Sequence, residues 1–357
     1  MKNFKALLLP FLATSLLLGS SLSEKAKKNG LLPIPNDPLE LAKLIDPHGV
    51  ITPKRVALGK QLYFEPRLSK SSLISCNWCH NLGLGGVDGV AKAIGHQWSG
   101  NPMHLNSPTV YNAVFAKRQF WDGRSPSLED QAMGPIQAGV EMAAPKEMVE
   151  KRINSIPEYV ASFKSAYGEN VTIDFEKIAS TIAIFERTLI TPSRYDDFLN
   201  GNEDALTDAE KEGLETFIDK GCITCHNGIA LGGEMQLFEL HDKYKYRDVG
   251  GFHGDAQGRV KVPTLRNITE TAPYFHNGMI WDLRQAIKEM SHVQMSYKAT
   301  KKSKGDGFNI TVNEIALTER DIDKIMDFFK ALEGRKPKII YPQLPKSTQA
   351  TIKPDEK

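Results

Sequence analysis

The sequence has few cysteines, no excess of either charge and few alternating strand patterns. Its 45 Lys and Arg residues nearly balance 43 Asp and Glu residues, and the net charge of +2 argues against nucleic acid or an acidic membrane as the main partner. Beyond the N-terminus, no apolar stretch is long enough to span a bilayer. The scarcity of alternating patterns argues against a β fold and predicts a mainly α protein with long loops and little β.

The N-terminal 22 residues have the layout of a secretory signal peptide. Lys2 and Lys5 precede an apolar run over residues 6–18, and small residues follow at positions 19–21. The run is short for a membrane span, and an uncleaved anchor is the alternative. No cysteine ends the run, which argues against a lipoprotein anchor. We therefore expect residues 1–22 to be a signal peptide and the mature protein to reside in the periplasm.

All four cysteines lie in two copies of the pattern Cys-x-x-Cys-His, at residues 76–80 and 222–226. This pattern is typical of covalent attachment of a c-type haem, so two copies predict two haems c and electron transfer. The two thiols add to the vinyl groups of the porphyrin, and the histidine that follows can bind the iron. Two disulfides, a cysteine-rich metal site or a redox pair are alternatives, but none needs a histidine after each pair. The predicted haem-binding residues are Cys76, Cys79, His80, Cys222, Cys225 and His226.

The two halves of the chain carry a degenerate repeat that extends beyond the haem motifs. The segment 108–112, Pro-Thr-Val-Tyr-Asn, corresponds to the segment 263–267, Pro-Thr-Leu-Arg-Asn. Phe120 and Phe275 follow at the same interval after the two prolines. The simplest explanation is two cytochrome c-like domains built on one plan. We place these domains at residues 31–185 and 186–335, with a tail rich in Lys and Pro at residues 336–357.

Capping patterns predict where several helices begin. Thr207 with Glu210 and Thr318 with Asp321 each form a capping box ahead of an apolar stripe. Both predicted helices lie in the second half of the chain.

The second axial ligand of a haem iron largely sets its potential and reactivity. Met290 is the candidate at the second haem, because it shares the apolar face of a predicted helix with Leu283. An ordinary core methionine is the alternative. The repeat favours a ligand, since the position that matches Met290 in the first half is Pro135, which cannot bind iron. A haem with His and Met ligands has a raised potential and suits electron transfer.

At the first haem, His96 and His104 are the candidate second ligands. His96 ends a glycine-rich segment, residues 83–96, that we expect to be a mobile loop; a solvent-exposed histidine is the alternative. A weakly held ligand on such a loop could leave the iron and open a site for a small oxidant. Glu141 could act there as a general acid–base if burial raised its pKa, and Trp121 could carry electrons between the haems. A solvated glutamate and a core aromatic residue are the alternatives.

Together these residues resemble the bacterial di-haem cytochrome c peroxidases, over about residues 31–335. The resemblance includes both haem motifs, Met290 and the segments at residues 95–98, 107–109, 120–124, 131–132, 134–135, 140–142, 263–267 and 272–278. It implies that His80 and His226 are proximal ligands and that Met290 is the distal ligand of a high-potential haem. It implies that His96 is the detachable ligand of a low-potential haem, where peroxide reacts. Gln131 and Glu141 would line that peroxide site, and Trp121 would lie between the haems.

The resemblance also implies further partners. A calcium ion would lie at the domain junction, held by the side chain of Asn106 and the backbone carbonyls of Thr271 and Pro273. Hydrogen peroxide would be the substrate, a monohaem cytochrome c or a copper protein the electron donor, and a homodimer the assembly. About two extra residues before Asn106 depart from the family pattern and bring in His104, which leaves open whether His96 or His104 is the detachable ligand.

Two other functions are compatible with two haem motifs. A related di-haem enzyme that oxidises a protein substrate, as in the maturation of a tryptophan-derived quinone, would carry tyrosine in place of Met290. A non-catalytic electron-transfer protein would have two closed irons. Glu141, Gln131 and the loop that carries His96 argue against that reading.

Overall fold

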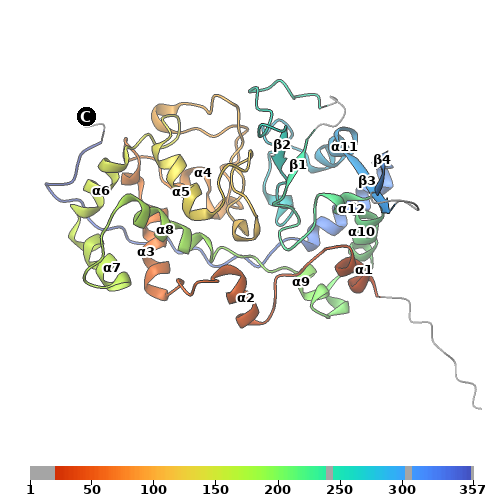
Figure 1. The fold of residues 1–357 in the computed structure, drawn as a ribbon, viewed down its shortest axis with the longest axis horizontal. Helices are drawn as coiled ribbons and strands as arrows, with labels where there is room; N and C mark the ends of the chain where they lie inside the picture. Colours follow the sequence, from red (N-terminus) through yellow and green to blue (C-terminus); the bar gives the residue numbers. More distant parts are fainter. Residues whose placement is uncertain (1–20, 239–243, 302–307, 355–357) are drawn as a thin grey trace, which may run out of the picture.

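The structure is a computed structural model that describes residues 21–238, 244–301 and 308–354, and it forms two helical halves side by side (Figure 1). The elements of the first half are α2 (Pro38–Ile45), α3 (Pro53–Tyr63), η1 (Pro66–Leu68), α4 (Cys76–Cys79), η2 (Leu82–Leu84), η3 (His96–Trp98), η4 (Ala113–Phe115), α5 (Leu128–Gln137), α6 (Lys146–Asn154), α7 (Pro157–Tyr167) and α8 (Phe175–Glu186), where η marks a short 3₁₀ helix. Those of the second half are α1 (Leu22–Lys28), α9 (Arg194–Leu199), η5 (Glu203–Ala205), α10 (Asp208–Asp219), η6 (Cys222–Thr224), β1 (Met235–Leu237), β2 (Arg259–Lys261), η7 (Ile268–Glu270), α11 (Leu283–Val293), β3 (Met295–Lys301), β4 (Phe308–Glu314) and α12 (Glu319–Ala331).

The predicted helix starts are confirmed. Thr207 caps α10 and Thr318 caps α12, and in each case both halves of the capping box are present. The strands of the described residues form two antiparallel pairs, β1 with β2 and β3 with β4. The mainly helical fold with little β is therefore as the sequence predicts.

Each half has its own hydrophobic core. In the first half α3 packs on α8, and in the second α10 packs on α12. Both crossings are close because a glycine lies at the contact. A Cβ on Gly59 would clash with the carbonyl oxygen of Thr181, and one on Gly213 would clash with that of Lys324. A glycine at each helix crossing means that the two halves share this packing feature as well as the sequence repeat.

The repeat also appears in the backbone, on both sides of the junction. Asn112 and Asn267 both have a left-handed conformation, with φ of 62° and 60°, as do Phe120 and Phe275, with φ of 65° and 68°. Both asparagine side chains donate a hydrogen bond to Oγ1 of Thr191, at 2.8 and 2.9 Å. Thr191 lies in the segment between α8 and α9, which connects the two halves. This connecting segment is therefore hydrogen-bonded to the matching asparagine of each repeat.

The two ends of the described chain cross to the opposite half. Ala26 of α1 and Leu31 are buried in the core of the second half. The tail after Arg335 has no helix or strand over its described residues and runs back along the first half, where Tyr341 packs edge-on against Phe64. Figure 1 shows the C-terminus beside α6 and α1 beside α10. The predicted signal peptide lies outside the described residues, apart from its last two positions.

The tail supplies acceptors for a buried arginine, and its removal should destabilise the first half. Arg152 is fully buried and donates to the carbonyl oxygens of Ile352 and Lys353, at 3.2 and 3.0 Å. A chain that ends after Arg335 removes these two acceptors, although Arg152 keeps its bonds to the carbonyl oxygens of Arg67, Ser69 and Lys70, so we expect a loss of roughly 2–4 kcal/mol in the free energy of unfolding, seen as a lower Tm. Ile340→Ser, at an exposed tail position, is the control. An unchanged Tm in the truncated chain would show that the tail adds nothing.

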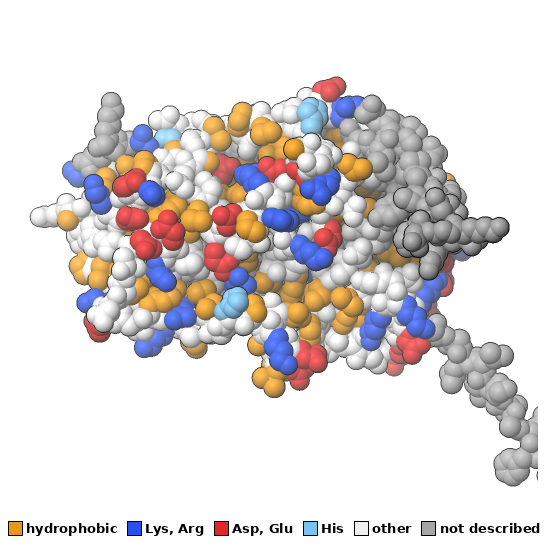
Figure 2. All heavy atoms as spheres, in the orientation of Figure 1, with side chains coloured by type: hydrophobic (Ala, Val, Ile, Leu, Met, Phe, Trp, Pro, Cys, Tyr) orange, Lys and Arg blue, Asp and Glu red, His pale blue; other side chains and the backbone are white. Residues whose placement is uncertain are grey.

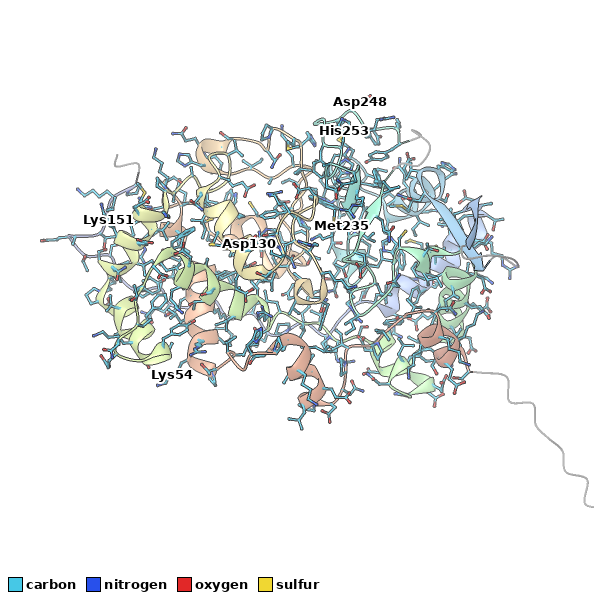
Figure 3. The ribbon with its side chains drawn as sticks, in the orientation of Figure 1. Lys54, Asp130, Lys151, Met235, Asp248 and His253 are labelled. Atoms are coloured by element: carbon cyan, nitrogen blue, oxygen red, sulfur yellow. The ribbon has the colours of Figure 1, made fainter. Side chains whose placement is uncertain are left out.

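The surface mixes acidic, basic and apolar side chains. On the face in Figure 2, Lys and Arg side chains lie interspersed with Asp and Glu, as expected from the balanced composition. None of the described helices is both long enough and apolar enough to cross a bilayer. Figure 3 places Met235, at the start of β1, in the middle of the molecule, where its side chain packs against Gly123 of the first half.

Candidate active site

The first Cys-x-x-Cys-His motif forms a single helical turn. Cys76 and Cys79 are the ends of α4, and the His80 N–H donates to the Cys76 carbonyl at 2.9 Å. The Nδ1 of His80 lies 2.9 Å from the carbonyl oxygen of Pro108, a contact that makes Nδ1 the protonated nitrogen. Burial lowers the pKa of His80, so the ring is neutral. Its Nε2 is then unprotonated and available to bind a metal.

The second motif repeats this geometry in the other half. Cys222 begins η6, and the His226 N–H donates to the Cys222 carbonyl at 3.0 Å. The Nδ1 of His226 lies 3.1 Å from the carbonyl oxygen of Leu231. Burial lowers the pKa of His226 to about 4. Metal-binding histidines are commonly oriented by such a bond from the other ring nitrogen, so both turns fit a haem iron.

The alternatives for the cysteines do not fit the structure. The four cysteines form no disulfide. Burial raises the pKa of the Cys79 and Cys222 thiols to about 12, whereas reactive cysteines have lowered values. Over the described chain, no three His, Cys, Asp or Glu side chains are grouped so that they could hold a metal ion by themselves. The residues therefore fit attachment of a porphyrin that brings its own iron.

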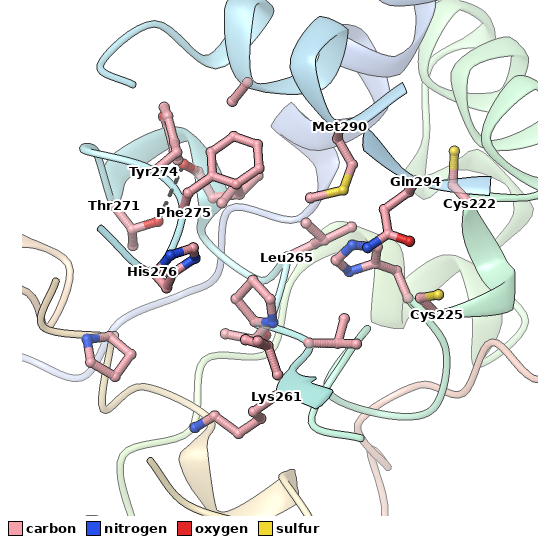
Figure 4. A pocket seen from close by; sticks show the side chains of 18 of the residues that line it. Cys222, Cys225, Lys261, Leu265, Thr271, Tyr274, Phe275, His276, Met290 and Gln294 are labelled. Atoms are coloured by element: carbon pink, nitrogen blue, oxygen red, sulfur yellow. Dashed lines mark hydrogen bonds between the residues drawn. The ribbon is translucent and has the colours of Figure 1, made fainter. Parts of the chain in front are cut away.

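A cavity of about 220 Å³ adjoins the second motif and reaches the junction between the halves. Cys222, Cys225, His226 and Met290 all line it. Figure 4 shows the Met290 side chain extending into the cavity from α11, while Cys222 and Cys225 lie together at one side of the cavity. Met290 is half-buried against the core of the second half. The predicted ligand thus lies on the cavity that would hold the second haem.

His96 is buried, with 7 % of its surface exposed, although it lies on the glycine-rich loop. Its backbone N–H donates to the carbonyl oxygen of Glu141 at 2.6 Å. The preceding Gly95 packs directly on the backbone of residues 140 and 141. A Cβ at this position would clash with the carbonyl oxygens of Val140 and Glu141. The loop is therefore seated directly on the segment that carries the predicted acid–base residue.

Glu141 lies on a tight turn after α5. Its N–H donates to the Ala138 carbonyl at 2.9 Å, and the chain then folds back onto the end of the helix. Burial raises the pKa of Glu141, and the charge of Arg124 partly opposes that shift. A raised pKa is the condition under which we expect Glu141 to act as a general acid–base. Gln131 is half-buried on α5 itself, so both predicted residues belong to one local unit with His96 beside it.

Trp121 lies at the junction between the halves. Its indole N–H donates to the carbonyl oxygen of Asn106 at 2.8 Å, and its own carbonyl accepts a bond from Lys261 N at 2.8 Å. The ring packs edge-on to His276 of the second half and lines the junction cavity. It therefore lies at the junction between the halves, and its predicted role in electron transfer between the haems stays a prediction.

The three predicted calcium ligands also meet at this junction. Asn106, Thr271 and Pro273 all line the cavity, and the Asn106 amide lies 2.6 Å from the Pro273 carbonyl oxygen. The Oδ1 of Asn106 is buried and has no hydrogen-bond partner within the described chain. His104, the alternative ligand, instead contacts the carbonyl oxygen of Asn277 through Nδ1, at 3.0 Å.

Two residues around the first motif escaped the sequence reading. Trp78, inside the motif, donates from its indole N–H to the carbonyl oxygen of Ile94 at 2.7 Å and packs on Trp98, with ring centroids 5.8 Å apart. Arg124, the last residue of the segment 120–124, is the charge that acts on Glu141. An aromatic residue between the two cysteines was the only available signal for Trp78.

Two haem-attachment turns on two cytochrome c-like halves define a di-haem c-type cytochrome. The family model described as di-haem cytochrome c peroxidase matches residues 53–204, and the cytochrome c model matches residues 210–333. The chain belongs to the di-haem cytochrome c peroxidase family.

Several named proteins are similar to this chain. The cytochrome c551 peroxidase of Pseudomonas aeruginosa is 40 % identical over 86 % of each chain, and that of Nitrosomonas europaea is 39 % identical over 88 % of this chain and 90 % of the relative. The methylamine utilization protein MauG of Methylorubrum extorquens is 30 % identical over 83 % of this chain and 82 % of the relative. A solved MauG-like protein associated with microbial copper homeostasis has a TM-score of 0.67 at 25 % identity, over 85 % of this chain and 93 % of the other.

Proposed function

We propose that this protein reduces hydrogen peroxide to water with electrons from a small electron-carrier protein. The overall change consumes one peroxide, two electrons and two protons and yields two waters. The observation that carries the proposal is the inequality of the two sites. A methionine lines the cavity beside the second motif, whereas at the first site the half-buried Glu141, whose pKa is raised, is bonded through its backbone to the loop that carries His96.

The residues of the first site have distinct roles. Haem supplies irons that change oxidation state by one electron and, at the first site, a position for peroxide. His80 would bind the first iron through Nε2, and His96 would be its detachable ligand, carried by the loop. The carboxylate of Glu141 takes a proton from peroxide at one oxygen and returns it to the other, where water leaves. Gln131, on the same local unit, donates from its amide to the bound oxygens.

The residues of the second site store and pass electrons. His226 and Met290 would bind the second iron, and a thioether ligand would favour its reduced state. Trp121 lies on the path between the sites and carries electrons across the junction. A tyrosine at position 290 would instead be expected of an enzyme that oxidises a protein substrate, so Met290 favours the peroxidase.

We propose that the pair formed by Trp78 and Trp98 holds the His96 loop closed, so that Trp78→Ala opens it. Trp98 and Gln97 both have left-handed backbones, with φ of 61° and 54°, a strained state that needs such contacts. Loss of the ring contact and the indole bond removes about 1–2 kcal/mol, which shifts loop release roughly tenfold. The fully oxidised variant should then have more high-spin haem by electron paramagnetic resonance, with Trp78→Phe intermediate.

The matched control for Trp78→Ala is Trp281→Ala, at an exposed tryptophan outside the loop. Haem content must be equal in all variants, because Trp78 lies between two attachment cysteines. A fully low-spin oxidised Trp78→Ala protein with normal haem content would contradict this role.

We further propose that Asn106, Thr271 and Pro273 hold a calcium ion at the junction. The buried Oδ1 of Asn106, which has no partner among the described residues, supports this assignment, since calcium prefers oxygen ligands. The amide nitrogen of the same side chain donates to the Pro273 carbonyl oxygen, so Asn106 and Pro273 lie together at the junction. Elemental analysis should find one calcium per chain, bound less tightly in Asn106→Ala. Protein without calcium that is fully active would remove the ion from the account.

The remaining parts of the proposal concern organisation and location. Residues 31–185 would form the peroxide-reducing domain and residues 186–335 the electron-accepting domain, with a monohaem cytochrome c or a copper protein as donor. A periplasmic protein, exported by the signal peptide at residues 1–22, would meet such donors, and fractionation tests this location. Sedimentation would test the proposed homodimer, where a single monomeric species counts against it.

Steady-state turnover tests the proposed function directly. The purified di-haem protein should oxidise a reduced small cytochrome c in proportion to added peroxide, at two cytochromes per peroxide. A protein with both haems that binds no peroxide in any oxidation state would be an electron-transfer module instead.

A further inference from the structure

Lys261 is a buried lysine at the junction between the halves. It ends β2, and its backbone N–H donates to the Trp121 carbonyl at 2.8 Å, which fixes the residue against the first half. Only 8 % of its surface is exposed, and its side chain lines the same cavity as Met290. In Figure 4 its ammonium group points away from Cys222 and Cys225, on the far side of the cavity.

The ammonium group has no hydrogen bond or ion pair among the residues that the structure describes. The carboxylate that acts on it is Asp122, but Asp122 already forms an ion pair with Arg124 at 2.8 Å. A buried charge is costly unless it is paired. The charge also acts on His80, whose pKa it helps to lower, so Lys261 of the second half reaches the surroundings of the first motif. Burial lowers the pKa of Lys261 to about 8, so the ammonium form is destabilised here, and an anion that none of the described side chains supplies would stabilise it.

We infer that Lys261 binds a propionate carboxylate of a haem at the junction. This inference rests on the proposed function only in requiring both haems. In a porphyrin attached through its vinyl groups, the two propionates leave from the opposite edge. Since Cys222 and Cys225 lie on one side of the cavity and the Lys261 ammonium on the other, the position of the lysine matches that edge.

The ion pair makes Lys261 a residue that ties the haem to both halves and sets its potential. A positive charge beside the porphyrin favours the reduced iron, because reduction lowers the charge of the haem. Through the bond from Lys261 N to Trp121, the same residue also fixes the tryptophan between the two sites.

The test compares Lys261→Met, which keeps length and removes charge, with Lys261→Arg, which keeps charge. Spectroelectrochemistry of the di-haem protein should show one haem with a reduction equilibrium shifted about tenfold toward the oxidised state in Lys261→Met, or about 59 mV for a one-electron couple. Lys261→Arg should stay near the wild type. The matched control is Lys117→Met, an exposed lysine near the junction that pairs with Glu234. The haem whose potential shifts is the one whose propionate contacts Lys261. The propionate bending band of that haem in resonance Raman spectra should also move.

Three results would overturn the assignment. Unchanged potentials and propionate bands in Lys261→Met would show that no propionate contacts the lysine. A shift equal to that of Lys117→Met would reduce the effect to general surface charge. A wild-type potential that depends on added phosphate or chloride, with the dependence lost in Lys261→Met, would assign the lysine to a free anion. Each result leaves the proposed function standing, whereas a protein without two haems would remove both.

Discussion

Replacing Glu141 by Gln should lower the turnover of peroxide by about 10²–10⁴-fold while the absorption spectra of both haems stay unchanged. The amide keeps the size of the carboxyl group but cannot accept and return a proton. Glu141 lies on a turn held by backbone bonds to α5, so the substitution leaves the position of the side chain intact. Steady-state kinetics with a reduced cytochrome c gives the ratio of rates.

The control for this substitution is Glu147→Gln, at an exposed glutamate in the first turn of α6. Its turnover should equal that of the wild type. Normal turnover in Glu141→Gln, with normal haem spectra, would remove Glu141 from the mechanism.

The raised pKa of Glu141 gives the pH profile a defined direction. The base form accepts the proton from peroxide, so activity should fall as the pH drops through the pKa, at a pH above the range of an ordinary glutamate. Because Arg124 lowers this pKa against the effect of burial, Arg124→Gln should raise it and move the acid limb of kcat/KM to higher pH. If the acid limb of kcat/KM does not move in Arg124→Gln, it reflects the titration of a group other than Glu141.

Replacing Met290 by Leu should remove the sulfur ligand of the second iron and lower the potential of that haem by on the order of a few tenths of a volt. Leucine has nearly the volume of methionine, so the packing of α11 on the second core is kept. The variant should accept electrons from its donor slowly, and its second haem should become high-spin. Met290→His should restore a low-spin iron but not the high potential.

Met326→Leu is the matched control, because Met326 is also a partly buried methionine on the second core, but on α12. It should leave both potentials unchanged. If Met290→Leu has the potential and spin state of the wild type, another residue binds the second iron, and Met290 is a core methionine.

Much of this organisation follows from short-range patterns that a sequence displays directly. Each haem turn and each capping box, at Thr207 and Thr318, depends on residues close together in the chain, and the structure has both capping boxes. The sequence repeat is also local within each half, and its matching residues Asn112 and Asn267 have the same backbone conformation. The partial burial of Glu141 follows less directly, because only its apolar neighbours Val140 and Met142 indicate it.

The remaining features depend on contacts between distant segments. His96 is buried because its loop seats on the backbone of Glu141, and a backbone-to-backbone bond leaves no mark on side-chain identity. The docking of the tail on Arg152 and the placement of Lys261 at the junction have the same origin. Only the folded arrangement brings these groups together.

The inequality of the two irons is tested most directly by a redox titration of the purified protein, followed by absorption and electron paramagnetic resonance. We expect two one-electron steps at well-separated potentials, with the haem that has a methionine ligand reduced first. High-spin signal from the other haem should appear at the half-reduced stage, as His96 leaves the iron. Two haems that stay low-spin and six-coordinate through the whole titration, without binding peroxide, would contradict the account.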